Sequence, residues 1–489
     1  MPPSLYALQS WPTIGSRVNV RDRDKEVEQR ARSPFVARRL RSVRHALGDE
    51  GFLRMTLVVR AVFWVIAYLG LVLSPLVFAV IGASHPDHGF WTNLSVALGF
   101  VGLAMMGLEF ALVARFRPLA APFGQDALLQ FHRQIGYVGL AFIVIHFAIS
   151  AKWNELTLAQ ALAAPLLVWF GMVALLSLVV LIATSVWRRG LRLSYEAWHI
   201  THTVLALVVV VGALGHIFFV DEYVSSLWKQ ILWALMSAAF IALLVWVRLV
   251  KPRRALARPW HLERVIAERG ETTTLALKPP PGAEFRFEPG QFGWFAIGRS
   301  PFSVTQHPFS FSSSAERGDL ELAVKALGDF TSGVSELEPG TTVYVDGPHG
   351  VFSIDQDEGP GFGLIAGGVG IAGLISMLRT MADRKDVRPA VLFYANDEWD
   401  GVIFRDELEQ LKDGLNLAVV HVLERPPDDW VGETGYVTAE VLARHLPASY
   451  RRFQFFICGP DAMMDAVETA LVHLGVSPER VHTERFDMV

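Results

Sequence analysis

The sequence predicts a bundle of six membrane helices, followed by a small antiparallel barrel and then by a doubly wound α/β domain. Three observations predict this fold class. Nearly all long apolar runs of the 489-residue chain fall before residue 252. Short alternating segments with Gly and Pro turns follow, and strands then alternate with helical segments. We therefore expect a basic tail over 1–54, a membrane domain over 55–252, a barrel over 253–357 and an α/β domain over 358–489.

Six apolar segments of the first half are each long enough to span a bilayer. Their approximate bounds are 57–81, 91–114, 132–151, 164–187, 199–220 and 229–250. One such segment could be a buried core helix of a large soluble protein, but six in succession with short loops indicate a multi-pass membrane protein. We expect membrane lipid around them, and the net charge of −4 gives no reason to expect nucleic acid as a partner.

The distribution of Lys and Arg predicts the orientation of the helices. Basic residues gather in the N-terminal tail and after the second, fourth and sixth segments, whereas the other loops contain a single lysine. We therefore expect both chain termini to lie in the cytoplasm, with the protein in a bacterial-type inner or plasma membrane. The third and fifth segments then run in the same direction.

Four histidines form two matched pairs inside the third and fifth segments. His132 and His146 are fourteen residues apart, and so are His202 and His216. On a helix this spacing is about 21 Å of rise and nearly four turns, so the two rings of one helix lie on roughly the same face. A single intramembrane histidine can simply hydrogen-bond another helix. Four at matched depths favour two b-type haems, one held by His132 and His202 and the other by His146 and His216.

Two other interpretations of the histidines are weaker. The pairs are too far apart along the helix axis to converge on one zinc or iron ion. His199 stands one turn before His202 and does not match the fourteen-residue spacing. We expect it at the membrane interface, or beside a haem propionate.

The second half of the chain changes its pattern at about residue 360. Before it, segments such as EFRFEPGQFGWFAI alternate and turn at Pro289-Gly290, as in an antiparallel barrel. After it, four strand–helix units predict a parallel sheet. The first turn, Gly367–Gly373, is typical of backbone that approaches a phosphate at a helix N-terminus, although such turns also occur without a nucleotide. The single cysteine, Cys458, excludes an intrachain disulfide and a four-cysteine iron–sulfur cluster.

Taken together, these residues resemble the ferric reductase and NADPH oxidase superfamily. The segment HPFS (His307–Ser310) is similar to its flavin-binding motif, and GDFT (Gly328–Thr331), GGVGIAG (Gly367–Gly373), CGP (Cys458–Pro460) and a near-terminal ERF follow in the family's order. The resemblance covers about residues 55–489. It implies an FAD-binding barrel and an NAD(P)-binding domain of the ferredoxin–NADP reductase type. The implied cofactors are FAD and two haems b, with NADH or NADPH as electron donor.

The resemblance also implies roles for individual positions. The residues implied to hold FAD are His307, Pro308, Phe309, Ser310, Gly328 and Thr331. Those implied to hold the nicotinamide dinucleotide are Gly367, Gly368, Gly370, Gly459 and Pro460. Cys458 would line the nicotinamide, with a small buried strand-end residue as the alternative. Phe486 would stack on the isoalloxazine ring, with a plain edge-strand aromatic as the alternative.

The implied function is electron transfer across the membrane. Electrons would pass from NAD(P)H to FAD, which can divide a two-electron donation into single steps, and then through the two haems to an external acceptor. The acceptor could be a ferric chelate, or dioxygen giving superoxide. Ser150 stands where superoxide-forming relatives have a histidine, which argues against a dedicated oxidase. Asp397 and Glu398 favour NADH, although Arg405 could reach a 2′-phosphate.

Two further classes of function remain as alternatives. The chain could be an electron-donating membrane subunit for a separate periplasmic or extracellular redox partner protein. It could also be a transporter or receptor with a degenerate reductase tail, but the retained HPFS, GGVGIAG and CGP motifs argue against that. A soluble oxygenase reductase is excluded, because it would need cysteines for an iron–sulfur cluster and has no use for six membrane spans.

Overall fold

The structure is a computed structural model, and it describes residues 57–81, 89–120, 123–153, 166–220, 224, 226–357 and 359–485. The expected basic tail over 1–54 and the candidate aromatic Phe486 lie outside the described residues. The chain divides into two compact units, Met1–Trp64 and Val65–Val489. All helices and strands after residue 88 belong to the second unit.

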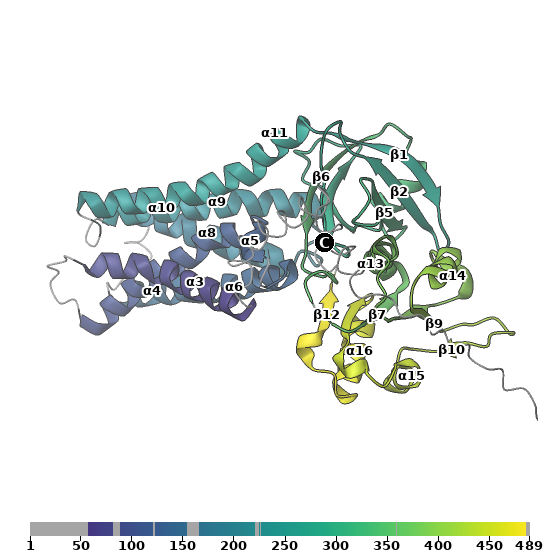
Figure 1. Ribbon diagram of the computed structural model, residues 1–489. Helices are drawn as coiled ribbons and strands as arrows, with labels where there is room; N and C mark the ends of the chain where they lie inside the picture. Colours follow the sequence, from purple (N-terminus) through teal and green to yellow (C-terminus); the bar gives the residue numbers. More distant parts are fainter. Residues whose placement is uncertain are drawn as a thin grey trace, which may run out of the picture. The chain divides into compact units, whose positions relative to one another are not determined.

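Six of the described helices are long and apolar enough to cross a membrane (Figure 1). They are α3 (Leu57–Val80), α4 (Gly89–Leu112), α6 (Gln125–Trp153), α8 (Leu166–Val186), α9 (Tyr195–Val220) and α10 (Leu227–Val245). The six predicted segments are therefore confirmed. Four helices begin earlier than expected, α4 at Gly89, α6 at Gln125, α9 at Tyr195 and α10 at Leu227. The difference is larger for α6 and α9, because polar residues before each apolar run belong to the helix too.

The membrane helices pack in neighbouring pairs. α4 lies along α6, and α8 lies along α9. A small core joins three of them through Met106, Leu178 and Val209. The outward side chains are apolar too, and those of Ile66 and Leu176 are 64% and 65% exposed. In a bilayer such side chains face lipid, so these helices have the exposed apolar surface that a multi-pass membrane protein requires.

Two short helices and a π-helical turn lie at the ends of this bundle. The short helix α5 (Arg117–Ala120) lies between α4 and α6. α10 continues into a π-helical turn over Trp246–Val250 and then into α11 (Lys251–Leu256). π-helical turns are rare and are frequent at functional sites.

The next part is a six-stranded antiparallel sheet in the order β4-β3-β6-β1-β2-β5. Its strands are β1 (Trp260–Ala267), β2 (Thr272–Lys278), β3 (Phe292–Ile297), β4 (His307–Ser310), β5 (Leu320–Lys325) and β6 (Thr342–His349). An antiparallel bridge between Phe311 and Leu322 connects the two outer strands, so the sheet curls toward a barrel around an aromatic core. The short helix α12 (Asp329–Ser332) follows β5.

The last part is an α/β domain with a wholly parallel sheet in the order β10-β9-β8-β7-β11-β12. Its strands are β7 (Phe362–Gly367), β8 (Ala390–Asn396), β9 (Leu417–Leu423), β10 (Glu433–Thr434), β11 (Gln454–Cys458) and β12 (Val481–Glu484). Its helices are α13 (Ile371–Arg384), α14 (Arg405–Gly414), α15 (Ala439–His445) and α16 (Asp461–His473). The fold class is confirmed, with two short strands, β10 and β12, beyond the four predicted.

Alternate residues of the parallel strands feed two separate cores, as the side-chain period of a strand requires. Leu364 and Tyr394 pack with α13 and α14 on one face. Ile365 and Phe393 pack with α15 and α16 on the other face (Figure 1). The strand order changes direction between β7 and β11. In doubly wound sheets, ligands bind beyond the carboxyl ends of the strands at such a point.

Buried polar side chains of α13 tie the α/β domain to the barrel. Ser376 donates a hydrogen bond from Oγ to the Ser313 carbonyl at 2.6 Å. The Ala315 amide donates to Oγ1 of Thr380 at 2.9 Å. These bonds fix the first helix of the α/β domain against the barrel.

Candidate functional site

The four predicted histidines meet in two pairs between α6 and α9. The ring centroids of His132 and His202 are 6.3 Å apart, and those of His146 and His216 are 6.4 Å apart. Two imidazoles that bind one metal ion from opposite sides, each at about 2.0–2.1 Å from nitrogen to metal, have centroids about 6 Å apart. Each pair therefore has the spacing of two axial ligands of one iron.

His146 is oriented by a serine of α4. The Nδ1–H of His146 donates to the Ser95 carbonyl at 2.8 Å, and Ser95 Oγ lies 3.1 Å from the same nitrogen. Because a carbonyl only accepts, Nδ1 carries the proton and Nε2 keeps its lone pair. Histidines that bind metals typically donate their other ring N–H in this way.

His202 has the same arrangement with a hydroxyl. Ser185 of α8 lies 3.2 Å from His202 Nδ1 and donates its own proton to the Leu181 carbonyl at 2.8 Å. The indole N–H of Trp198 also donates to Ser185 Oγ, at 3.1 Å. Ser185 therefore accepts from His202, and again Nε2 is left with its lone pair.

The partner of His132 is a carboxylate. Glu109 of α4 accepts a short hydrogen bond from His132 Nδ1 through Oε2. Glu109 of α4 and Ser185 of α8 thus orient the rings of His132 and His202. The sequence offered one signal for Glu109 that the prediction missed, since an ionisable residue inside a membrane span commonly marks a functional site.

Two glycines leave room for the rings of His146 and His216. A Cβ at Gly99 of α4 would lie 3.1 Å from Nδ1 of His146, and a Cβ at Gly171 of α8 would lie 3.0 Å from Nδ1 of His216. Both rings therefore pack directly on helix backbone. The facing rings, the tautomers set by Nδ1 partners and this close packing fit one bis-histidine haem at each pair.

Two other intramembrane residues from the sequence analysis lie beside these pairs. His199 is not part of a histidine pair, and its Nε2 lies 2.9 Å from Nη2 of Arg248 on the π-helical turn. Ser150 lies one turn beyond His146, and its Oγ is 2.8 Å from Ser95 Oγ. The hydroxyls of Ser95 and Ser150 thus lie beside His146.

The HPFS segment forms β4 and pairs with β3, so that Pro308 lies opposite Trp294 and Ser310 opposite Phe292. His307 stacks on Phe330 of the GDFT segment with ring centroids 3.9 Å apart, which brings the two predicted flavin motifs together. Among the residues that the structure describes, His307 Nε2 and Trp294 Nε1 are buried without a hydrogen-bond partner. Such unpaired polar atoms fit a bound group with a polar edge, such as a flavin ring.

The electrostatic setting of His307 favours its neutral form. Burial, and then the positive charge of Arg299, lower the pKa of His307. In the GDFT turn, Thr331 Oγ1 accepts from the amides of Leu327 and Gly328, each at 2.9 Å. Thr331 therefore stiffens the turn, while a Cβ at Gly328 would have open space around it.

The Gly-rich turn and the CGP segment meet at the carboxyl ends of two neighbouring strands. Cys458 of β11 lies opposite Ala366 of β7. A Cβ at Gly370 would lie 2.2 Å from the Cys458 carbonyl oxygen, so this glycine permits the close approach of the two turns. Gly368 has a φ of +52° and open space around its Cα. It is the glycine of this turn best placed to let a ligand approach the backbone.

Close packing also accounts for the remaining members of the predicted nucleotide set. A Cβ at Gly367 would lie 2.8 Å from Cδ of Pro460, and a Cβ at Gly459 would lie 3.0 Å from Gly367 Cα. Two residues of this site were missed by the prediction. The hydroxyl of Tyr394 donates to the Gly368 carbonyl at 3.1 Å, and Glu484 lies opposite Cys458 on β12.

Charged residues cluster after β8 and β9. Arg425 lies 3.3 Å from both Asp397 and Glu398. Arg405 lies over the Trp399 ring, with its guanidinium carbon 4.5 Å from the ring centroid. The prediction named the two acids and Arg405 but missed Arg425, because only the parallel register brings the end of β9 beside the end of β8.

A cationic residue of the loop after α4 contacts the barrel. Arg115 lies over the Trp294 ring at 3.9 Å and is 3.2 Å from Asp346. Burial lowers the pKa of the Arg115 guanidinium, and Asp346 works against that effect. Burial alone would raise the pKa of Asp346. The contact with His349 Nε2 at 3.4 Å and the charges of Arg115 and Lys251 outweigh burial and hold that pKa well below its usual range.

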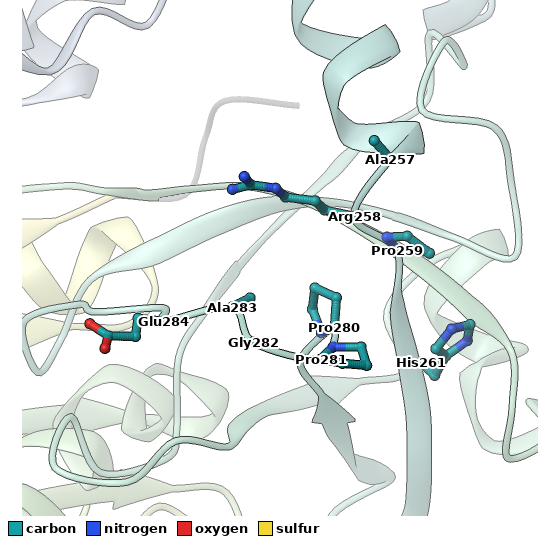
Figure 2. Close-up of a pocket in the computed structure, with 9 residues that line it drawn as sticks. All are labelled: Ala257, Arg258, Pro259, His261, Pro280, Pro281, Gly282, Ala283 and Glu284. Atoms are coloured by element: carbon teal, nitrogen blue, oxygen red, sulfur yellow. The ribbon is translucent and has the colours of Figure 1, made fainter.

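A cavity of about 430 Å³ lies apart from these residues, at the start of β1 (Figure 2). It is lined by Ala257, Arg258, Pro259, His261, Pro280, Pro281, Gly282, Ala283 and Glu284. None of the predicted site residues lines it, so the cavity is separate from the histidine pairs and from the flavin and nucleotide motifs.

Comparisons with known proteins match three consecutive parts of the chain. Residues 98–213 match the ferric reductase like transmembrane component, residues 261–353 an FAD-binding domain, and residues 364–469 the oxidoreductase NAD-binding domain. This combination defines a multi-pass membrane protein of the NAD(P)H-dependent flavin oxidoreductase class. The chain belongs to the ferric reductase and NADPH oxidase superfamily.

Curated relatives are similar to part of the chain. NADH-cytochrome b5 reductase 1 of Aspergillus terreus is 31% identical over 198 residues, which is 39% of this chain and 67% of that protein. The protein of the same name from Arabidopsis thaliana is 31% identical over 175 residues, 35% of this chain and 62% of its own length. The chain thus spans about two thirds or less of these relatives. Among solved structures, Amycolatopsis cytochrome P450 reductase GcoB is 26% identical, with 47% of this chain and 69% of that chain covered and a TM-score of 0.42.

Proposed function

We propose that this protein moves electrons from cytoplasmic NAD(P)H across a bacterial-type plasma membrane to an acceptor on the outer side. The observation that carries the proposal is the pair of facing imidazoles at each of two depths, with centroids 6.3 and 6.4 Å apart. Hydrogen-bonded helix packing alone does not require ring pairs at the spacing of axial ligands. The basic loops support cytoplasmic termini.

The chain's own residues divide the work. His132 with His202, and His146 with His216, would hold two haems, while β3, β4 and the GDFT turn would hold FAD. Gly368 would admit the dinucleotide phosphates and Cys458 would line the nicotinamide. When bound, FAD accepts two electrons together from a nicotinamide and releases them singly, and each haem iron carries one electron.

The choice of donor and acceptor follows from charge and ligation. Asp397 and Glu398, which follow β8, neutralise the charge of Arg425, which follows β9. This neutralisation favours NADH over a donor with a 2′-phosphate. The relatives named as NADH-cytochrome b5 reductases support the same donor. Two histidines at each iron leave no open coordination position, so we expect outer-sphere transfer to a ferric chelate or to dioxygen.

Visible spectroscopy of the purified, haem-supplied protein tests this proposal. In detergent without oxygen, NADH should bleach the flavin band and then develop the α-bands of reduced b-type haem, with NADPH acting more slowly. His146→Leu should remove about half of the haem while retaining the flavin. A well-folded protein without haem bands would refute the proposal. If the reduced protein transfers electrons to neither ferric chelate nor dioxygen until another protein is added, the chain is an electron-donating subunit instead.

A further inference from the structure

A single buried carboxylate lies inside the membrane spans. The six spans contain two acidic residues, and Glu196 is exposed in the first turn of α9. The other, Glu109, is 7% exposed and lies in the last turn of α4. Burying a charged group inside a membrane is unfavourable, and such residues are usually paired and functional.

Glu109 gives His132 an acidic partner, whereas the serines that contact Nδ1 of His202 and His146 are neutral. In the proposed orientation, His132 and His202 are the cytoplasmic pair, and His146 and His216 are the outer pair. Glu109 accepts the Nδ1 proton of His132. Ser185, a neutral hydroxyl, accepts from His202 of the same pair, and the neutral carbonyl and hydroxyl of Ser95 face His146 of the outer pair. A carboxylate withdraws the Nδ1 proton more strongly than a hydroxyl or a carbonyl does. The Nε2 atom of His132 therefore becomes a stronger electron donor.

We propose that Glu109 is a positioning residue that makes the cytoplasmic haem the weaker oxidant of the two. The inference rests on the proposed function. A stronger axial donor stabilises ferric over ferrous iron and lowers the midpoint potential. One electron that leaves the cytoplasmic iron, oxidising it from Fe²⁺ to Fe³⁺, and reduces the outer iron from Fe³⁺ to Fe²⁺ then moves downhill. Glu109 thereby sets the direction of transfer toward the outer side.

Redox titration of the full-length, haem-loaded protein tests the inference. Absorbance at the haem α-band, followed anaerobically against potential, should resolve two one-electron components. Glu109→Gln keeps the shape of the side chain and removes its charge. It should raise only the lower of the two midpoint potentials, by about 59 mV. For a one-electron couple this rise is a tenfold change in the equilibrium distribution of the electron between the two haems. Glu109→Asp should lie between wild type and Glu109→Gln.

The matched control is Ser185→Ala, which removes a neutral partner from His202 of the same pair and should shift the lower midpoint less than Glu109→Gln does. The component that survives in His146→Leu identifies the cytoplasmic haem. Unchanged midpoints in a fully loaded Glu109→Gln protein, or equal shifts of both midpoints, would overturn the inference. If Glu109→Gln does not load haem, the comparison of Glu109→Asp with wild type decides in the same way. A wild-type protein without haem refutes the proposed function itself, which is a different result.

Discussion

Arg379 is the residue on which the joint between the barrel and the α/β domain most depends. This arginine of α13 binds Glu407 of α14 through Nε and Nη2, both at 2.7 Å, and Glu321 of β5 through Nη1 at 2.8 Å. It also donates to the Ser312 carbonyl at 2.8 Å. The side chain of Arg379 is 11% exposed, and those of Glu321 and Glu407 are 16% and 33% exposed.

Replacing Arg379 by alanine should therefore be costly. Removal of one partner of a buried ion pair leaves the other charge without compensation and typically destabilises a protein by about 3–5 kcal/mol. We expect about 3 kcal/mol, because Glu407 is partly exposed and can regain water. For a soluble part of this size, that loss lowers the unfolding temperature by roughly 6–12 °C.

Thermal unfolding in detergent, followed by release of flavin fluorescence, measures the effect. Arg317→Ala is the matched control, since Arg317 also connects the barrel to α13 through Asp383, at 2.9 Å, but is 56% exposed. Exposed ion pairs contribute about 0–1 kcal/mol, so this variant should unfold within a few degrees of wild type. If Arg379→Ala costs no more than Arg317→Ala, the account of a buried ionic joint is wrong.

Three further predictions concern the histidine pairs, acid stability and the donor. Gly171→Val should displace the His216 ring, because a Cβ at position 171 would lie only 3.0 Å from Nδ1 of that ring. The variant should therefore lose about half of the haem. Burial lowers the pKa of His421 to about 4 from 6.5, so the unfolded chain binds more protons between these values. Above pH 6.5 this histidine does not lower the free energy of unfolding, and toward pH 4 that free energy falls by up to about 3 kcal/mol. His421→Phe should remove this loss in acid unfolding experiments. Asp397→Ser should remove one of the two acids that neutralise Arg425 and raise kcat/KM for NADPH relative to NADH about fivefold, or about 1 kcal/mol.

Each of these has a contrary result. Full haem content in Gly171→Val would contradict the close packing of the outer ring, and Gly70→Val is its control because a Cβ there meets nothing within 4 Å. An acid transition unaltered by His421→Phe would mean that this histidine already ionises in the folded protein. An unchanged donor preference in Asp397→Ser would show that the cluster after β8 does not contact the ribose.

The class of protein could be predicted from local patterns alone. Apolar run length determines which segments span a bilayer, and the helical repeat places His132 and His146 on one face; both are properties of a single segment. The strand–helix alternation and the Gly-rich turn likewise predicted the parallel sheet. The strands that were missed, β10 and β12, contain two and four residues, too few to show any periodicity.

The tertiary structure decided which residues meet. Glu109 and His132 are 23 positions apart on different helices, and Arg379 joins residues 58 and 28 positions away. The same holds for the glycines, since only the packing of two turns shows that Gly370 faces Cys458 while Gly368 is open.

The sequence by itself therefore determined the membrane helices, the depth of the four histidines and the order of the domains. Those features follow from the hydrophobicity and periodicity of individual segments. The tertiary structure decided the partner of each histidine, because the rotation and spacing of packed helices depend on side chains from several segments at once. The difference between the carboxylate that contacts His132 and the serines that contact His202 and His146 arises at that level.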